Sequence, residues 1–292
     1  MIIELLVAIL LFAGVPAGIY IFARKKVTWE GIEDMFDRYR YHFFFLILIS
    51  IMKSLFGFLE APVEKLYAIN FTPMVYEFEG NRIFWVQHTL HHPAMTFAMA
   101  VVYIGSFLFI MVFSVAFFAY LDYRKVASKL IYLNLVLFTL CIPFYLLVEV
   151  YVPSYPKMFY PEANSIISGM QPLLYNYGPN VNQFFLNYDT FNNCFPSMHI
   201  GYPAAILMTV LMEVKGFRGF KIALATGLGL IAVAIIYLGI HWLSDIVGGL
   251  LIATLGVAIM QKYAFRFWRH VKNLDTRLKS LKKRLVRSKD DA

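Results

Sequence analysis

Two short stretches of this chain combine residue types that could carry out nucleophilic and acid–base chemistry. Residues 195–199 read FPSMH, and residues 237–245 read YLGIHWLSD. In the second stretch His241 and Asp245 are four residues apart, so on a helix they would share a face. The carboxylate could then hold one imidazole N–H and leave the other nitrogen free to attack an electrophile. The spacing therefore predicts an oriented histidine nucleophile.

The first stretch could supply the remaining groups for moving a phosphate-containing group. Ser197 follows a proline at a predicted helix start, where its hydroxyl and free backbone N–H groups can bind an anion such as a phosphoryl oxygen. Histidine titrates near neutral pH, so His199 could give a proton to a leaving oxygen. Together the two stretches would provide an anion site, an acid, a nucleophile and an orienting carboxylate.

A histidine cluster at His88, His91 and His92 is a further candidate binding site. Its helical spacing could bring His88 beside either partner to bind a metal, but no cysteine or nearby carboxylate completes a ligand set. We interpret these as interface histidines, with His88 and His92 as candidate ligands of a substrate phosphate. The two cysteines, Cys141 and Cys194, form neither a zinc pattern nor a disulfide framework. We expect no bound metal and no cofactor.

The composition places these motifs in a membrane protein. Of 292 residues, 60% are hydrophobic and 15% are charged, whereas soluble domains have roughly 45–50% and about 25%. Apolar runs of about 20 residues, the length at which a helix crosses hydrocarbon, recur along the chain. We predict an all-α fold, a polytopic transmembrane helical bundle. The expected spans are seven: 2–23, 41–59, 95–120, 129–150, 197–213, 219–239 and 244–262.

The basic residues predict the orientation of these spans. Lys and Arg follow the first, third, fifth and seventh spans, whereas the alternate connections are poor in both and rich in aromatic residues. By the positive-inside rule, the N-terminus and both motifs then lie on the extracytoplasmic side of the cell membrane, with the C-terminus in the cytoplasm. This pattern explains the net charge of +8 better than nucleic-acid binding does. The expected partners are the bilayer and a lipid phosphate or phospholipid substrate.

The chain is expected to divide into a transmembrane catalytic domain, 1–262, and a basic tail, 263–292. Within the first part, segment 60–94 should form short helices at the outer interface, and 151–196 should form a long outer loop. Leucines at helical spacing among Lys and Arg predict that the tail is an amphipathic helix along the inner leaflet. A solvated basic tail is the alternative.

The C-terminal half resembles the phosphatidic acid phosphatase type 2 superfamily. Pro196-Ser197-Met198-His199 is similar to the family's Pro-Ser-Gly-His element, with methionine in place of glycine. Residues 237–245, followed by Gly248 and Gly249, are similar to its Ser-Arg…His-x-x-x-Asp element. The resemblance implies a six-helix phosphatase-like core, here with one extra helix.

The resemblance also implies roles for individual residues. His241 would attack phosphorus to form a phosphohistidine, and Asp245 would support it. His199 would protonate the leaving group, and Ser197 would bind phosphate. That mechanism requires no metal.

Two basic signatures of the superfamily are missing. Ile235 stands where an arginine is expected six residues before the nucleophile, and Lys-x6-Arg-Pro occurs nowhere. Such absences are typical of the branch similar to inositol phosphorylceramide synthases, which move a phosphate-linked head group between lipids. Residues 150–157 loosely resemble the proline-rich stretch of that branch, which makes Lys157 a candidate phosphate ligand. Arg82 and Lys65 are further candidates on the outer side.

These observations lead to one preferred hypothesis and two alternatives. The preferred one is a phosphatase or phosphotransferase that cleaves a phosphoryl bond of a lipid phosphate, diphosphate or phosphodiester and passes the group to water or an alcohol. The first alternative is a transporter, flippase or channel lined by the same polar residues, for which Pro143 within the fourth span is a weak mark. The second is an inactive relative that binds phospholipid.

Overall fold

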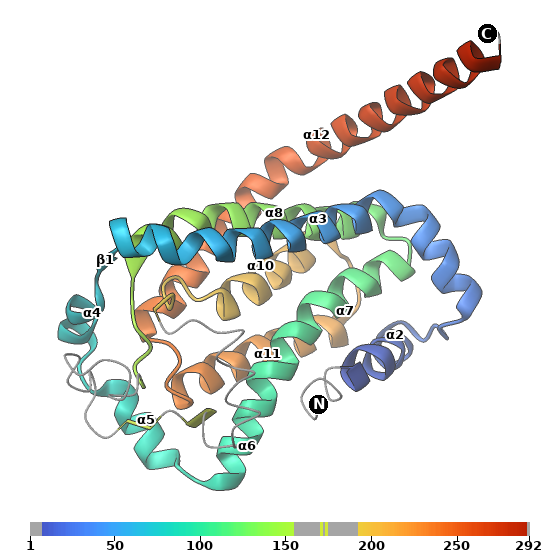
Figure 1. The fold of residues 1–292 in the computed structure, drawn as a ribbon. Coiled ribbons are helices and arrows are strands. Elements are labelled where there is room, and N and C mark those ends of the chain that lie inside the picture. Colours follow the sequence, from blue (N-terminus) through green and yellow to red (C-terminus); the bar gives the residue numbers. More distant parts are fainter. Residues whose placement is uncertain (1–7, 155–169, 172, 175–191, 291–292) are drawn as a thin grey trace.

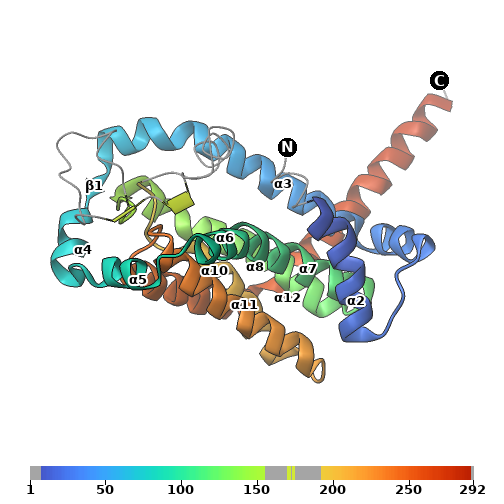
Figure 2. The ribbon, with the colours of Figure 1, turned by 90° about the horizontal axis from the view of Figure 1, so that it is seen from below.

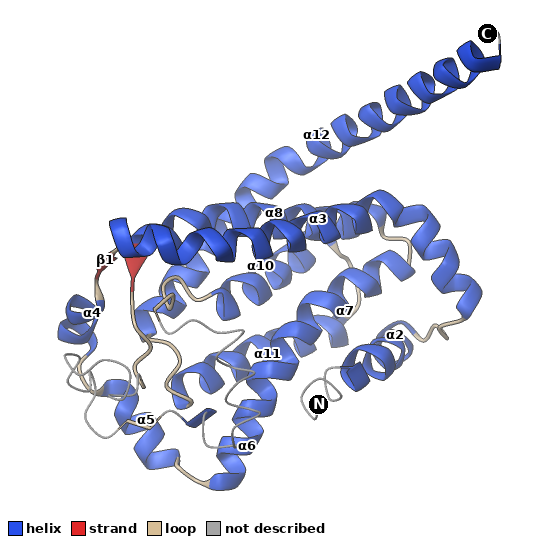
Figure 3. Ribbon diagram, viewed as in Figure 1, coloured by secondary structure: helices blue, strands red, loops and turns tan. Residues whose placement is uncertain are grey.

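The computed structural model describes residues 8–154, 170–171, 173–174 and 192–290. Within these residues the fold is helical apart from two-residue strands (Figure 3). Five helices are long and apolar enough to cross a membrane, and two shorter apolar helices cover Leu10–Ala23 and Met198–Glu213. The prediction of an all-α membrane bundle is confirmed, with an apolar helix at each of the seven expected positions.

The elements follow the order labelled in Figure 1. The N-terminal part contains the π-helical segment η1 (Leu10–Gly14), α2 (Val15–Ala23), α3 (Trp29–Tyr67), β1 (Ile69–Asn70), α4 (Thr72–Glu79) and α5 (Arg82–Leu90). The remainder contains α6 (Pro93–Val101), the π-helical segment η2 (Val102–Ser106), α7 (Phe107–Tyr120), α8 (Arg124–Leu147), β2 (Val148–Glu149), α10 (Met198–Glu213), α11 (Arg218–Tyr237) and α12 (Leu243–Asp290). The run from α6 to α7 forms one continuous span.

Two helices are longer than the expected spans. α3 begins at Trp29, before the apolar run, where Arg38 pairs with Asp34 one turn earlier at 2.6 Å. α12 continues without a break to Asp290, and its C-terminal part projects away from the bundle (Figure 1). The expected basic tail is therefore helical and continuous with the last span, while its position at a membrane surface remains a prediction.

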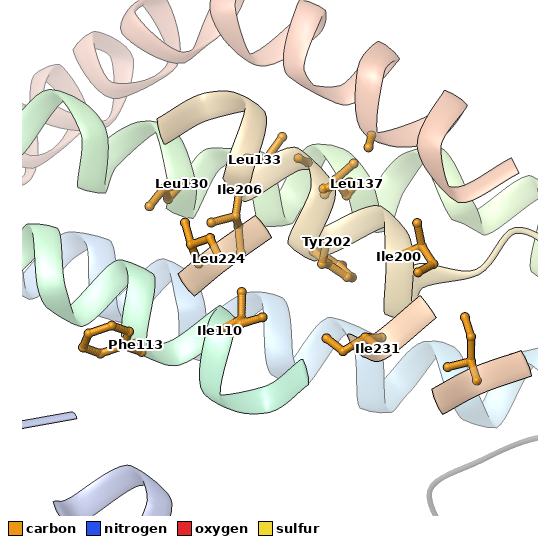
Figure 4. Close-up of a cluster of buried hydrophobic side chains, with 14 of the residues drawn as sticks. Ile110, Phe113, Leu130, Leu133, Leu137, Ile200, Tyr202, Ile206, Leu224 and Ile231 are labelled. Atoms are coloured by element: carbon orange, nitrogen blue, oxygen red, sulfur yellow. The ribbon is translucent and has the colours of Figure 1, made fainter. Parts of the chain in front are cut away.

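α10 lies at the centre of the bundle. It packs against α7, α8, α11 and α12, and Figure 4 shows buried side chains of α7, α8, α10 and α11 meeting around it. Ala204 and Ala205 are fully buried there, and such small side chains let neighbouring helices approach closely. This packing fixes the first turn of α10 relative to α11 and α12.

The connections between helices gather at two opposite ends of the bundle. One end holds α4, α5, the end of α11 and the starts of α10 and α12, and we call it the site end (Figures 1 and 2). The other end holds the connections at residues 24–28, 121–123 and 214–217, which are flanked by Lys and Arg, and we call it the basic end. Segment 60–94 contains the short helices α4 and α5 after the end of the long helix α3, and the position of this segment at an outer interface stays a prediction.

A paired ionic cluster lies at the basic end. The ammonium of Lys129 on α8 donates to Glu213 Oε1 at 2.6 Å and also to Gln261 Oε1 on α12. Lys125 Nζ lies 2.9 Å from the second oxygen of Glu213, and Gln261 Nε2 donates to the first. The cluster therefore joins α8, α10 and α12 through charges that partner one another.

Asp122 stabilises the nearby turn between α7 and α8. Its Oδ1 accepts a hydrogen bond from Arg124 Nε at 2.9 Å and another from the Tyr39 hydroxyl of α3 at 3.4 Å. The hydrogen bond from Arg124 is the main cause that lowers the pKa of Asp122 below its ordinary value. The turn is thus held most strongly when this carboxyl is ionised.

Strand pairing and side-chain hydrogen bonds connect the segments at the site end. β1 and β2 pair in parallel, and Val150 forms an isolated bridge with Asn193 just before the FPSMH stretch. The indole N–H of Trp242 donates to the carbonyl of Tyr151 at 2.8 Å. The side-chain amide of Gln87 on α5 donates to the carbonyl at the end of α11, Tyr237 O, at 3.1 Å. These bonds hold the outer segments against the ends of the helices.

Candidate active site

The two chemistry-bearing stretches meet at the site end. α10 begins at Met198, α11 returns from the basic end to Tyr237, and α12 begins at Leu243. Because two helices separate the stretches, the chain comes back to the same end, as the sequence predicted. The starts of α10 and α12 therefore lie side by side.

His241 lies in a turn rather than on a helix, which corrects the helical spacing expected for it. After α11 the chain reverses through Gly239, whose φ of 72° is a conformation that glycine adopts without strain. A side chain at Gly239 would also meet Ser154 Cβ at 2.8 Å. His241 follows this turn, is 5% exposed, and comes close to Asp245 because the next helix starts immediately after it.

Asp245 orients His241 and caps α12 at the same time. It is fully buried in the first turn, and its Oδ2 lies 3.1 Å from His241 Nδ1. The same oxygen accepts the backbone N–H of Trp242 at 2.8 Å, the reciprocal half of a capping box. The other oxygen, Oδ1, is buried with no hydrogen-bond partner in the described part of the chain. We assign the proton of this hydrogen bond to His241 Nδ1, because an ionised carboxylate can only accept.

His199 continues this hydrogen-bonded chain. Its Nδ1 lies 3.2 Å from His241 Nε2. With the Nδ1 proton of His241 assigned to the bond with Asp245, His241 Nε2 is the acceptor and His199 Nδ1–H the donor of the second bond. The ring of His199 is held by Tyr103 and Phe107, at centroid distances of 4.6 and 4.7 Å. The three side chains therefore form one hydrogen-bonded chain that leads from Asp245 through His241 to His199.

Ser197 occupies the N-cap position of α10, as predicted, but its side chain caps nothing. Its backbone N–H donates to the carbonyl of Asp245 at 3.0 Å, which ties the start of α10 to the first turn of α12. Its hydroxyl is buried and has no hydrogen-bond partner among the described residues. A Cβ at Gly249 of α12 would lie 2.3 Å from the carbonyl oxygen of Ser197, so this close approach requires glycine. Ser197 thus keeps a buried hydroxyl without a partner among the described residues at the start of α10, two residues before His199, although it is not one of the described residues that line the cavity in front of the histidines.

Glu79, which sequence reasoning missed, holds the turn that carries His241. It ends α4, is 2% exposed, and accepts the backbone N–H groups of Leu243 at 2.8 Å and Ser244 at 2.6 Å. These are donors of the first helical turn that no intrahelical partner can satisfy, and a carboxylate there is also favoured by the helix dipole. Nothing in the sequence marks Glu79, because its partners lie more than 160 residues away.

A cavity of about 370 Å³ opens in front of the two histidines. His199 and His241 both line it, and most of the remaining described wall is aromatic or apolar, including Phe56, Phe107 and Phe138. Lys53 of α3 is the only lysine or arginine among the described residues that line this cavity. Sequence reasoning missed Lys53 as well, although a charged residue inside an apolar span is itself a signal of function.

The other predicted phosphate ligands lie elsewhere. Arg82 is exposed on α5 and donates to the carbonyl of Phe78, and Lys65 is exposed near the end of α3. Neither lines the cavity in the part of the chain that the structure describes. Lys157 lies outside the described residues. Their roles as phosphate ligands stay predictions. The structure does not place Arg82 or Lys65 next to the histidine pair.

The histidine cluster is divided between two helices. His88 stacks on Phe84 within α5 at a centroid distance of 5.4 Å. His92 is the N-cap of α6, where its Nδ1 accepts the backbone N–H of Ala94 at 3.2 Å. Both side chains are exposed, and neither is among the described residues that line the cavity.

One group of side chains has the chemistry of a metal site. Cys194, His241 and Asp245 are buried, and one ligand atom from each lies within 4.8 Å of the others. Two of them are already joined by the hydrogen bond between His241 and Asp245. A metal ion would have to replace that bond, since metal–ligand distances are about 2.0–2.3 Å.

The comparison with protein families agrees with this geometry. The family model described as the PAP2 superfamily matches residues 78–259, from the end of α4 into the first part of α12. The chain belongs to the PAP2 superfamily. The match includes Glu79 and both chemistry-bearing stretches, and it reaches further toward the N-terminus than the C-terminal half in which the motifs lie. No curated protein and no solved structure matches the chain significantly.

Membership of the PAP2 superfamily indicates a phosphatase-type activity on lipid phosphates. In this member, the position where the superfamily's arginine is expected is Ile235, which is completely buried in the core at the end of α11. No cation therefore comes from that position of the chain.

Proposed function

We propose that this PAP2 protein is a membrane enzyme that cleaves a phosphoryl bond of a lipid phosphate, diphosphate or phosphodiester through a phosphohistidine at His241. The observation that carries the proposal is the hydrogen-bonded order Asp245, His241, His199 at the wall of one cavity. The superfamily match supports the phosphatase-type chemistry, and the apolar wall suits a lipid substrate.

In the first step His241 Nε2 attacks phosphorus, and the bond from phosphorus to the leaving oxygen breaks. The leaving oxygen takes the Nδ1 proton of His199, which enters the step as the imidazolium, protonated on both nitrogens, and leaves it as the neutral imidazole. Asp245 stabilises the positive charge that forms on His241. In-line transfer places the leaving oxygen opposite the nucleophile, so substrate must separate the two rings, whose nitrogens lie 3.2 Å apart without it.

In the second step water or an alcohol attacks the phosphohistidine. The bond from phosphorus to His241 Nε2 breaks, and His199, now neutral, takes the proton of the attacking hydroxyl. Ser197 binds a phosphoryl oxygen through its free hydroxyl during both steps. An alcohol on a second lipid would make the protein a head-group transferase, as in the branch similar to inositol phosphorylceramide synthases.

The test is turnover by purified protein, with chelator present, on a panel of lipid phosphates, lipid diphosphates and inositol phospholipids. His241→Ala should lower the rate by about 10³-fold or more, because it removes the nucleophile. The matched control is His270→Ala, since His270 is an exposed histidine of α12 that bonds only to the carbonyl of Arg266 among the described residues. Acid-labile labelling of wild-type protein by a radioactive substrate should disappear in His241→Ala.

Each other outcome has a definite meaning. Activity that survives His241→Ala contradicts the phosphohistidine, and activity abolished by chelator points to a metal held by Cys194, His241 and Asp245. Inactivity of the wild type on the whole panel, combined with lipid flux across vesicles, would support a transporter instead. Inactivity with retained phospholipid binding would support an inactive relative.

A further inference from the structure

We infer that Lys53 of α3 is the cation that binds the substrate's phosphate in this protein. The inference rests on the proposed function. It assigns to Lys53 the phosphate binding that the missing arginine and the missing Lys-x6-Arg-Pro signature would otherwise provide. Ile235 is buried in the core and carries no charge. Among the described residues that line the cavity, Lys53 is the only lysine or arginine.

The contacts of Lys53 place its ammonium inside the bundle. Its Nζ donates to the hydroxyl of Tyr202 at 3.0 Å and to Asn134 Oδ1 at 3.3 Å. It also lies 4.8 Å from the centre of the Tyr202 ring and 5.6 Å from that of Phe138. Lys53 therefore points from α3 toward α8 and α10, although only 6% of the apolar stretch of α3 is buried inside the bundle.

These contacts leave the charge of Lys53 without a counter-ion. Its described partners are a hydroxyl, an amide oxygen and two aromatic rings, and no described carboxylate forms a salt bridge with it. An ammonium in a membrane span is costly unless it is paired, and such groups mark substrate pathways. A phosphate anion in the cavity would provide the missing pair.

The position of Lys53 relative to the histidines suits this role. Tyr202, which holds the ammonium, follows His199 by three residues on α10, which is about one helical turn. Lys53, His199 and His241 all line the same cavity. A phosphoryl group bound in this cavity against His241 Nε2 can therefore also face the ammonium of Lys53.

The experiment compares phosphate binding in Lys53→Gln with that in wild type. Glutamine keeps a polar side chain that can bond to Asn134 and Tyr202, but it removes the charge. We expect the inhibition constant of inorganic phosphate and the KM for a lipid phosphate to rise about tenfold or more, since a charge-assisted contact is lost. The concentration of inorganic phosphate needed to raise the melting temperature by a given amount should increase by the same factor.

Two further variants separate binding from structure. Lys25→Gln is the matched control, because Lys25 also lies over a tyrosine ring, Tyr120, at 5.1 Å but near the basic end. It should leave the phosphate constant unchanged. Lys53→Arg keeps the charge and should restore phosphate affinity to within a few-fold of wild type. If Lys53→Gln does not fold, Lys53→Met provides the uncharged member of the comparison with Lys53→Arg.

The outcomes distinguish this inference from the proposed function. An active wild type whose phosphate constant and KM are unchanged in Lys53→Gln would overturn the role of Lys53 and leave the histidine mechanism intact. A lower melting temperature with an unchanged inhibition constant of inorganic phosphate would equally overturn it. That result would mean that Lys53 stabilises the fold and does not bind phosphate. A wild type that neither turns over the panel nor is stabilised by inorganic phosphate refutes both.

Discussion

Lys53 and Lys129 both place an ammonium inside the bundle, but their partners differ. At the basic end, Lys129 bonds to the carboxylate of Glu213 and to Gln261. Near the site end, Lys53 has neutral partners only among the described residues. A buried charge with a protein counter-ion serves the fold, whereas one without a counter-ion is available to an anionic ligand.

The same contrast extends to the groups around each lysine. At the basic end the oxygens of Glu213 both have cationic partners. At the site end the hydroxyl of Ser197 and one oxygen of Asp245 are buried without a hydrogen-bond partner among the described residues. Other buried atoms without a hydrogen-bond partner in the described part of the chain, Arg38 Nε, His42 Nδ1 and Ser114 Oγ, lie on α3 and α7 away from the candidate site. Unsatisfied buried groups are costly to the fold, and those of Ser197 and Asp245 differ from the others in lying next to the histidine pair in the chain. Variants at the two ends should therefore affect different properties.

Asp245→Asn should produce the largest change, and the change should be in activity. The amide can still accept the N–H of Trp242 through its oxygen, but it no longer provides the negative charge that supports His241. We expect kcat to fall by about 10²–10⁴-fold, by analogy with loss of the orienting carboxylate in other histidine mechanisms. Steady-state kinetics and a melting curve of the same preparation measure both properties. A large loss of stability with a normal kcat would mean that Asp245 serves the fold, as Lys129 does, and would contradict the difference between the two ends.

Lys129→Met should show the opposite behaviour. It removes one partner of a buried pair and leaves Glu213 with Lys125 and Gln261. We expect a loss of about 2–3 kcal/mol in the free energy of unfolding, near the lower end for breaking a buried ion pair because these partners remain. Unfolding in a mixed-detergent titration measures this loss, and the kcat of the folded fraction should equal that of wild type. A selective rise in KM would place Lys129 in the binding site and contradict the comparison.

Glu79→Gln should give an intermediate effect on activity. The amide cannot accept both N–H groups of Leu243 and Ser244 as a carboxylate does, so the turn that carries His241 loosens. We expect kcat to fall about tenfold, which corresponds to the one to two kcal/mol of a lost helix cap. Glu77→Gln is the matched control on α4, because Glu77 is exposed. Equal kcat values for the two variants would show that Glu79 does not position His241.

Asp122→Asn should give the smallest change, in stability alone. Since the hydrogen bond from Arg124 lowers the pKa of Asp122, its stabilising contribution is present at neutral pH and is lost as the pH falls through that lowered pKa. At neutral pH we expect the melting temperature of the variant to fall by about 1 °C or less, because the pair is largely exposed. In acid below the lowered pKa the two proteins should melt together. A difference that grows on acidification would have the wrong sign for this mechanism.

The sequence by itself determined the helices and which parts of the chain could meet. Apolar runs of about 20 residues have few alternatives in a membrane, so spans such as α8 and α11 were found within a few residues. The two ends of α3 and the length of α12 were not, because helices can continue beyond the hydrocarbon. The contact between the two stretches followed from counting, since two helices between them return the chain to the same end.

Only the tertiary structure decided which side chains complete the site. The FPSMH stretch and the pair His241–Asp245 could be recognised because the residues of each lie close together in the sequence. The pair does not share a helix, however, because His241 lies in the connection before α12. Glu79 and Lys53 reach the site from α4 and α3, whose positions depend on how whole helices pack. Lys65 and Arg82 looked equally suitable by charge, yet they point elsewhere. Charge and spacing specify the chemistry that is available, whereas the packing of distant helices decides which charges face the same cavity.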